Sequence, residues 1–159
     1  MLNFFRFWFF PAPYYLRVSR DRVLARNVST GHFVEVTPKI GVDNKYTIVS
    51  VGDPVDPQAT KVLRPFEHPR VLFNEFAAAE KILQFVIREL SPKKFFAPSN
   101  VVVVHPDSEL EGGLTQIEAR ALREMVQGAG AREVHIYCGP ALSDREVEDG
   151  TYEKWGEES

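Results

Sequence analysis

The sequence predicts an α/β fold, in which a mixed sheet of about five strands packs against at least two helices. Residues 101–104 are four consecutive valines, and so short a β-branched run is typical of a strand buried on both faces. A helical pattern over residues 115–128 and an alternating pattern over residues 133–137 follow this run. Together they predict a β-α-β unit whose strands are parallel and joined by a right-handed crossover.

The first part of the chain supplies the remaining strands. Residues 14–27 alternate between apolar and polar side chains as a hairpin does, with Ser19, Arg20 and Asp21 at its turn. Further strands are predicted at residues 32–37 and 46–51, with a turn at residues 42–45 and a loop at residues 52–57.

Two helices are indicated by apolar residues spaced three and four positions apart. Asn74 is predicted to cap the first, and Thr115 with Glu118 forms a capping box that begins the second. Gly128 and Gly130 are predicted to end the second helix, because glycine readily adopts positive φ. The predicted buried faces are Phe76, Ala79, Leu83, Val86, Ile87 and Leu90 in the first helix, and Ile117, Ala121, Leu122, Met125 and Val126 in the second, with Glu118 on the polar face.

The N-terminal segment, residues 1–13, is strongly aromatic. A membrane-spanning helix needs about 20 apolar residues, and this run is about half as long. Two hypotheses remain open: a membrane-surface anchor, or an arm that packs on the domain or on a partner protein. Arg6 is its single basic residue, so attraction to anionic lipid would be weak. The side chains predicted to contact membrane or partner are Leu2, Phe4, Phe5, Phe7, Trp8, Phe9 and Phe10.

Composition excludes several classes of protein. The chain has 159 residues, the size of one ordinary domain, and a net charge of −3, which argues against binding to nucleic acid. Its one cysteine, Cys138, cannot form an internal disulfide and is expected to be a buried, inert thiol. The histidines lack cysteine or carboxylate neighbours at ligand spacing, so no metal site is predicted.

The C-terminal tail, residues 143–159, is rich in acidic residues and is expected to be frayed. Tyr152 and Trp155 are its exceptions, because such side chains can dock on the domain or on a partner. An acidic loop with Asp107, Glu109 and Glu111 follows the valine strand and is interpreted as solvated. His105, at the end of that strand, is expected to make a structural hydrogen bond, since no nucleophile accompanies it.

A family resemblance rests on the second helix and the strand after it. The pattern Thr-x-x-Glu-x-Arg-Ala-Leu-Arg-Glu from Thr115, then Gly-Ala-Gly-Ala-Arg-Glu-Val from Gly128 and Pro-Ala at Pro140, is similar to the first lobe of the bacterial rod-shape protein MreB. The resemblance implies a single actin-like (ribonuclease H-like) lobe over residues 14–142, with a mixed five-stranded sheet and β-β-β-α-β-α-β order. A complete actin-like ATPase has two lobes that close on a nucleotide.

The chain departs from this family at the residues that carry its chemistry. The family's Asp-x-Gly-Thr phosphate loop corresponds to Leu16, Val18 and Ser19, and its Glu-Glu-Pro corresponds to Cys138, Gly139 and Pro140. A thiol and a hydrogen cannot orient the attacking water as a carboxylate does. A small subdomain of the family also looks shortened after Val51. We therefore expect no ATP hydrolysis, no catalytic residues and no cofactor.

These departures favour a non-catalytic MreB-like protein that acts in cell shape or envelope organisation. Its expected partners are an MreB-type filament or further copies of itself. The expected location is the cytoplasm, where the aromatic segment would allow a peripheral position at the inner face of the cell membrane. The alternative is a nucleotide-binding or ATPase subunit completed by a second chain, with Arg17, Ser19 and Arg20 on the phosphate. A third hypothesis is a relic domain with an unrelated small-molecule role.

Overall fold

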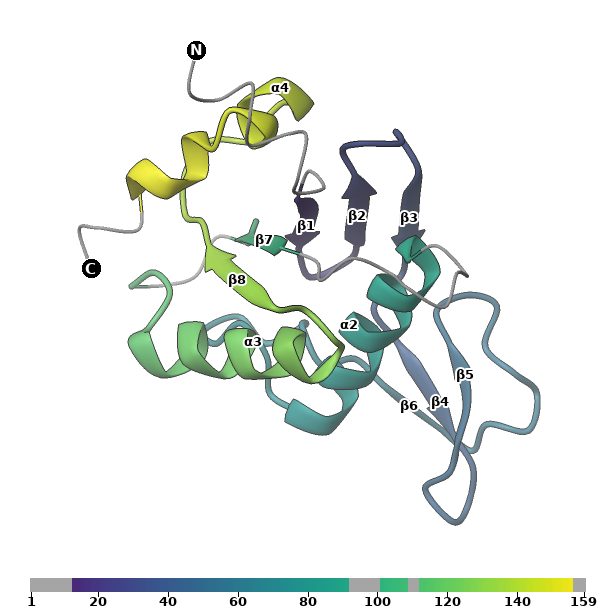
Figure 1. Cartoon of the computed structure of the whole chain (residues 1–159). Coiled ribbons are helices and arrows are strands. Elements are labelled where there is room, and N and C mark those ends of the chain that lie inside the picture. The colour runs from purple at the N-terminus through teal and green to yellow at the C-terminus, as the bar shows by residue number, and fades with distance from the viewer. Residues whose placement is uncertain (1–12, 92–100, 109–111, 156–159) are drawn as a thin grey trace.

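The computed structural model describes residues 13–91, 101–108 and 112–155, and its centre is a five-stranded mixed sheet in the order β3-β2-β1-β7-β8 (Figure 1). β1 pairs antiparallel with β2 and parallel with β7, and β8 is parallel to β7. The predicted β-β-β-α-β-α-β order of this sheet and its parallel β-α-β unit are confirmed. The strands are β1 (Tyr14–Val18), β2 (Val23–Asn27), β3 (Phe33–Val36), β7 (Val101–Pro106) and β8 (Glu133–Ile136), and the helices between them are α2 (Phe76–Leu90) and α3 (Gln116–Gly128).

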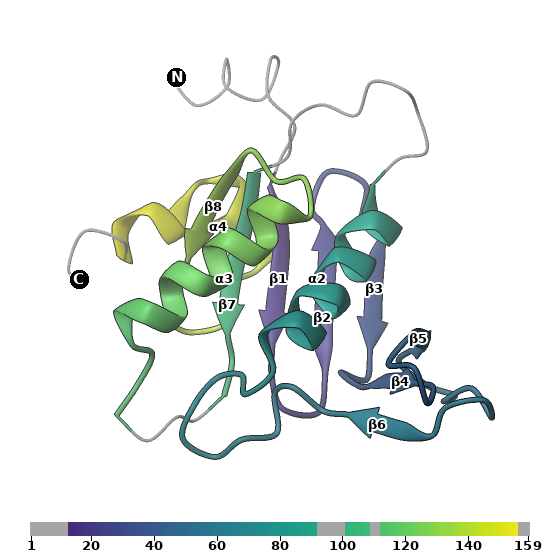
Figure 2. The same cartoon turned by 90° about the horizontal axis from the view of Figure 1, so that it is seen from below.

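A second, three-stranded sheet lies beyond the end of β3 (Figure 2). It consists of β4 (Ile40–Val42), β5 (Ile48–Val51) and β6 (Lys61–Leu63). The sequence-based prediction was wrong here, because it put Val42 in a turn, missed β6 and did not separate β5 from the main sheet. Gly41 is required in β4, since a Cβ atom there would lie 2.9 Å from Cβ of Ala59.

One face of the main sheet is covered by α2 and α3. Leu16, Val18, Val102 and Val104 point to this side and are fully buried with the helices' apolar residues. Glu75, not Asn74, is the N-cap residue of α2, and its side chain makes no capping hydrogen bond. The predicted capping box of α3 is confirmed.

In the first turn of α3, however, the predicted burial of two residues is reversed. Ile117 is 82% exposed, whereas Glu118 is only 8% exposed. The Glu118 carboxylate accepts hydrogen bonds from the backbone N–H groups of Leu72 (2.7 Å) and Thr115 (2.9 Å). The capping box therefore turns Glu118 inward, where it also fastens the segment that leads into α2.

The opposite face of the sheet is covered by the C-terminal residues. α4 (Asp144–Glu148) and the 3₁₀ helix η1 (Thr151–Trp155) place Val147 and Tyr152 in a cluster with Tyr15, Val103 and Tyr137. The expectation of a frayed tail is wrong up to residue 155, because these apolar side chains are buried. The predicted docking of Tyr152 is confirmed, since it is 3% exposed.

No helix within the described residues is both long and apolar enough to cross a membrane. Three sets of predicted residues lie outside the part of the chain that the structure describes: the aromatic residues of the N-terminal segment, Glu109 and Glu111. The anchor and arm hypotheses for the N-terminal segment therefore stay predictions.

Candidate functional site

The carboxyl ends of β1, β7 and β8 meet at one end of the main sheet, where the β1–β2 turn and the loop after β7 come together. Arg17 lies beside His105 across β1 and β7, and Val104 lies beside Ile136 across β7 and β8. Ligands of α/β proteins commonly bind at such an end. A hollow of about 300 Å³ opens there, lined by His105, Pro106, Asp107, Ser108, Gly113, Leu114, Cys138 and Gly139.

His105 closes the inner side of this hollow through a chain of hydrogen bonds. The backbone N–H of Leu142 donates to the Tyr15 hydroxyl oxygen (3.1 Å), and that hydroxyl lies 2.7 Å from Nδ1 of His105. The Tyr15 hydroxyl can therefore donate its own proton to Nδ1 of a neutral imidazole. A further hydrogen bond joins the His105 ring to the backbone of Gly139. The prediction of a structural hydrogen bond for His105 is confirmed.

Burial disfavours charge on this network. Desolvation lowers the pKa of His105 below its ordinary value, and the nearby Arg17 guanidinium acts in the same direction, against the opposing effect of Asp107. Desolvation likewise raises the pKa of Tyr15. The His105 imidazole is thus held from β1 and from the segment after β8, which suits a structural role.

Arg17 is occupied by an ion pair with Asp107, which joins β1 to the loop after β7. The backbone N–H of Asp107 also donates to the Val18 carbonyl oxygen (2.7 Å). Asp107 is thus part of a structural link, and an anion would have to compete with it for the Arg17 guanidinium.

Ser19 and Arg20 lie close by, at the β1–β2 turn. The Ser19 hydroxyl donates to the Arg22 carbonyl oxygen (2.8 Å), and Arg20 donates to the Pro69 carbonyl oxygen (3.2 Å). Both residues border a smaller hollow of about 280 Å³ that Asp21, Asp107 and Ser108 also line. The buried Ser108 hydroxyl has no hydrogen-bond partner among the described residues. Sequence reasoning missed Ser108, because a lone serine in a loop carries no pattern.

The residues that the family resemblance placed at the phosphate loop and at the second acid are tightly packed. Leu16 and Val18 are fully buried in the core of the main sheet. At Gly139, an added Cβ atom would lie 2.6 Å from Cζ and 3.0 Å from Cε2 of Tyr137. The Tyr137 ring is 1% exposed, and its hydroxyl donates to the Pro140 carbonyl oxygen (2.8 Å). The aromatic ring thus occupies the space that a carboxylate side chain at residue 139 would need.

Cys138 corrects a prediction, because it is exposed at the rim of the hollow and is not a core residue. The adjacent protein still raises the pKa of its thiol by desolvation, which disfavours the reactive thiolate. Within the described ranges, no three His, Cys, Asp or Glu side chains gather as a metal site would require.

Comparison with known proteins connects this geometry to one family. The family model described as MreB/Mbl protein matches residues 47–143. The cell shape-determining protein MreB of Pasteurella multocida is 35% identical over 84 residues, which are 53% of this chain and 22% of that protein. MreB of Escherichia coli strain K12 is 44% identical over 66 residues, 42% of this chain and 18% of that protein. The chain thus covers about a fifth of the curated MreB relatives it matches.

A shorter relative and two solved structures complete the comparison. The uncharacterized protein YjaA of Escherichia coli strain K12 is 37% identical over 91 residues, 52% of this chain and 72% of that protein. Crystal structures of MreB5 of Spiroplasma citri bound to AMPPNP and to ADP give TM-scores of 0.58 and 0.59 at 16% and 18% identity. They cover 78% and 79% of this chain and 38% of each MreB5 chain, and they establish the actin-like fold. The chain belongs to the MreB/Mbl family.

Proposed function

We propose that this chain is a non-catalytic member of the family, which acts in cell shape or envelope organisation by contacting other proteins. The observation that carries the proposal is the Tyr137 ring beside Gly139, because it fills the space of the acid expected to position the attacking water. A family scaffold with little room for that acid is consistent with a protein that acts by binding other proteins.

The buried Leu16 and Val18 support the same conclusion. A phosphate loop needs an acid near the metal and a glycine that lets the backbone approach the phosphate. The β-branched Val18 and the apolar Leu16 side chain provide neither, and both contribute to the core. The burial of these two side chains thus supports the absence of the family's phosphate loop at this turn.

Co-sedimentation with filaments of Escherichia coli MreB tests the proposed contact. The full chain is expected to pellet with filaments and to stay in the supernatant without them. Comparison with a variant lacking residues 1–10 separates filament contact from contact through the aromatic segment. Absence of both forms from the filament pellet would contradict an MreB filament as the partner.

The aromatic segment suggests a second location for these contacts, at the inner face of the cell membrane. Flotation with vesicles of neutral lipid and with vesicles containing anionic lipid measures this directly. Because Arg6 is the single basic residue of the segment, binding is expected to depend little on lipid charge. Loss of flotation when Phe7 and Trp8 are both changed to serine would support an anchor, whereas no flotation of the full chain would exclude one.

The alternative is a nucleotide-binding subunit that a second chain completes. The specific observation in its favour is the hollow near Ser19 and Arg20. Ser108 also lines this hollow, and its hydroxyl has no hydrogen-bond partner among the described residues. Magnesium ATP at 100 times its Kd would raise the unfolding free energy by about 2.7 kcal/mol. A melting temperature that does not change at millimolar magnesium ATP would argue against this alternative, whereas phosphate release above background would contradict the non-catalytic proposal.

A further inference from the structure

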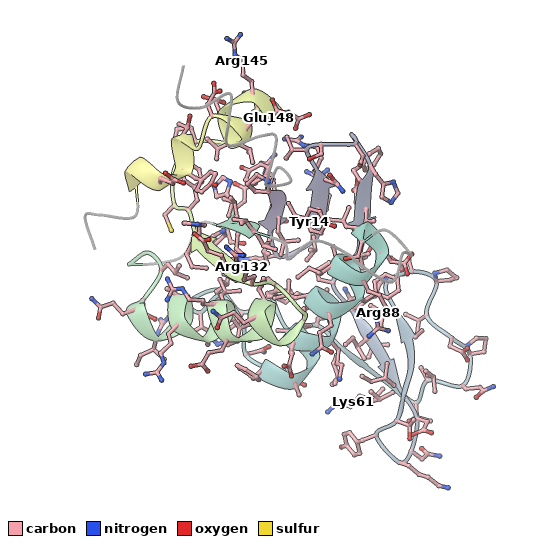
Figure 3. The ribbon with its side chains drawn as sticks, in the orientation of Figure 1. Tyr14, Lys61, Arg88, Arg132, Arg145 and Glu148 are labelled. Carbon is pink, nitrogen blue, oxygen red and sulfur yellow. The ribbon has the colours of Figure 1, made fainter. Side chains whose placement is uncertain are left out.

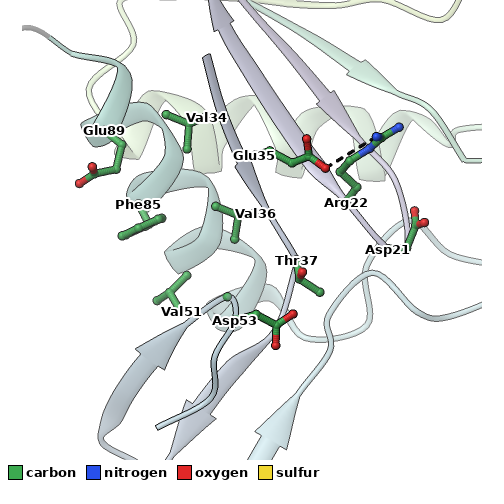
Figure 4. A pocket seen from close by; sticks show the side chains of 11 residues that line it. Asp21, Arg22, Val34, Glu35, Val36, Thr37, Val51, Asp53, Phe85 and Glu89 are labelled. Atoms are coloured by element: carbon green, nitrogen blue, oxygen red, sulfur yellow. Dashed lines mark ion pairs between the residues drawn. The ribbon is translucent and has the colours of Figure 1, made fainter. Parts of the chain in front are cut away.

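β3 is an edge strand of the main sheet, and a hollow of about 760 Å³ follows it (Figure 4). In Figure 4 Phe85 and Glu89 lie on α2 to one side of β3, while Val51 and Asp53 lie near the lower end of β3, and all four side chains line the hollow. This volume is within the range of about 300–1,000 Å³ that is usual for binding clefts. It lies at the edge of the main sheet opposite β8, and of its lining residues Asp21 alone also borders one of the two hollows described above.

The hollow runs along the free edge of β3, because side chains from both faces of the strand line it. Val34 and Val36 point toward α2, and Glu35 points to the other face, where Arg22 lies 3.7 Å away. Within the described residues, β3 pairs with β2 alone, so its outer N–H and C=O groups are open to another strand.

The chemistry of the groove selects its occupant. Its floor is apolar, with Val34, Val36, Val51 and Phe85. Its rim carries Asp21, Glu35, Asp53 and Glu89. Glu35 pairs with Arg22 and Asp53 pairs with Lys39, so Asp21 and Glu89 give the rim its excess negative charge. An extended segment that pairs with β3 would therefore gain from apolar side chains on one side and from lysine or arginine near the rim.

We propose that an extended segment of a partner protein, with apolar side chains alternating with lysine or arginine, adds to the main sheet along β3. Strand addition of this kind obtains affinity from backbone hydrogen bonds and specificity from alternate side chains. A second copy of this chain fits less well, because two acidic rims would face one another. This inference rests on the proposed function, because it names a surface for the proposed protein contacts. It can still hold if the partner is not an MreB filament.

Titration of the full chain with a fluorescein-labelled heptapeptide of alternating lysine and valine tests the surface. Binding is expected, and it should weaken as salt is added. A peptide of the same length with proline at its centre should bind at least tenfold more weakly, because proline cannot complete the backbone pairing. Equal binding of the two peptides, or no binding of the first, would overturn the proposal.

Two matched variants locate the binding site. Glu89 lies in the last turn of α2 and Glu148 in the last turn of α4, which is remote from the groove (Figure 3). Lysine is compatible with both helix ends, so both variants should fold. Glu89→Lys is expected to weaken peptide binding about fivefold, which is the upper limit for the loss of an exposed charge pair. Glu148→Lys is expected to weaken peptide binding less than twofold. Equal effects of the two substitutions would contradict binding in the groove.

Hydrogen exchange provides an internal comparison, because β3 and β8 are the two edges of one sheet. Peptide binding should slow amide exchange in residues 33–36 and leave residues 133–136 unchanged.

Two other occupants of the groove give different results. Protection of β3 by concentration-dependent dimerisation without peptide would assign the groove to a second copy. Peptide binding that appears only after Arg6→Glu would assign it to the chain's own N-terminal segment. Either result would overturn the assignment to a partner.

Discussion

The Tyr15 hydroxyl lies 2.7 Å from Nδ1 of His105, although ninety positions of sequence separate the two residues. The parallel pairing of β1 with β7 brings them together, and the Arg26 guanidinium lies 5.5 Å from the centre of the Tyr15 ring. This contact joins the first strand, the valine strand and, through the N–H of Leu142, the start of the C-terminal helices. The Tyr15–His105 contact therefore fastens three segments of the chain at this end of the sheet.

The first prediction concerns the pH dependence of stability. The pKa of His105 in the folded protein lies below its unfolded value of 6.5, so the unfolded chain binds more protons as the pH falls. The contribution of His105 to the unfolding free energy is therefore fully present above pH 6.5. It decreases as the pH falls through that value and stops decreasing below the pKa of His105 in the folded protein. Urea unfolding between pH 7.5 and pH 5 should show this loss.

The same pH range separates His105 from the carboxylates. Hydrogen bonds hold the pKa of Glu118 below its ordinary value of 4.5 despite the opposing effect of burial, so its contribution is lost only at lower pH. His105→Gln should remove most of the dependence between pH 7.5 and pH 5, whereas the exposed His32→Gln should preserve it. An unchanged slope in His105→Gln would show that another group titrates.

The second prediction concerns the inward carboxylate of α3. Glu118→Ala removes the acceptor for the backbone N–H groups of Leu72 and Thr115. Leaving buried donors unpaired and losing the capping box should cost about 2–4 kcal/mol of unfolding free energy. Ile117→Ser, one residue away but exposed, should change stability by less than about 0.5 kcal/mol. Similar losses in both variants, measured by urea unfolding, would contradict the reversed assignment of these positions.

The third prediction concerns the C-terminal helices. Tyr152 packs against His135, with ring centres 4.9 Å apart, and belongs to the cluster on the second face of the sheet. Tyr152→Ala should therefore cost about 3–5 kcal/mol, as truncation of large buried aromatic side chains does. Glu148→Ala on the exposed side of α4 is the control and should have little effect. Limited proteolysis should cleave the Tyr152→Ala protein earlier, and equal resistance of the two variants would indicate a tail that does not contribute to the fold.

Local patterns predicted the main sheet and its helices because the deciding contacts lie within each element. The four valines, the Thr115 capping box and the alternating hairpin each needed only neighbouring residues. By contrast, β4 and β6 have three residues each, too few for a repeating pattern. Their pairing depends on the close approach at Gly41, which no local signal reveals.

Sequence reasoning placed three candidate residues near one another but could not show what holds them. The ends of β1 and β7 do bring Arg17, Ser19 and Arg20 to one place. Sequence could not show that Arg17 is held by Asp107 or that the Tyr137 ring covers Gly139, because these contacts depend on side-chain packing across strands. The exposure of Cys138 escaped prediction for the same reason.

The fourth prediction tests whether the family's acids can be restored. Gly139→Glu places a side chain against the buried Tyr137 ring and should cost about 1–3 kcal/mol, as overpacking of a core does. Cys138→Glu adds a carboxylate at an exposed position and should change stability by less than about 0.5 kcal/mol.

If the chain is non-catalytic as proposed, neither substitution should produce phosphate release from magnesium ATP above background, because Leu16 and Val18 remain buried in the core. Urea unfolding and a phosphate assay on both variants check the two expectations separately. If Gly139→Glu is as stable as the unchanged chain, the Tyr137 ring can move aside and does not by itself block an acid at residue 139. If that variant also hydrolyses ATP, the chain has kept a working nucleotide site and the non-catalytic proposal fails.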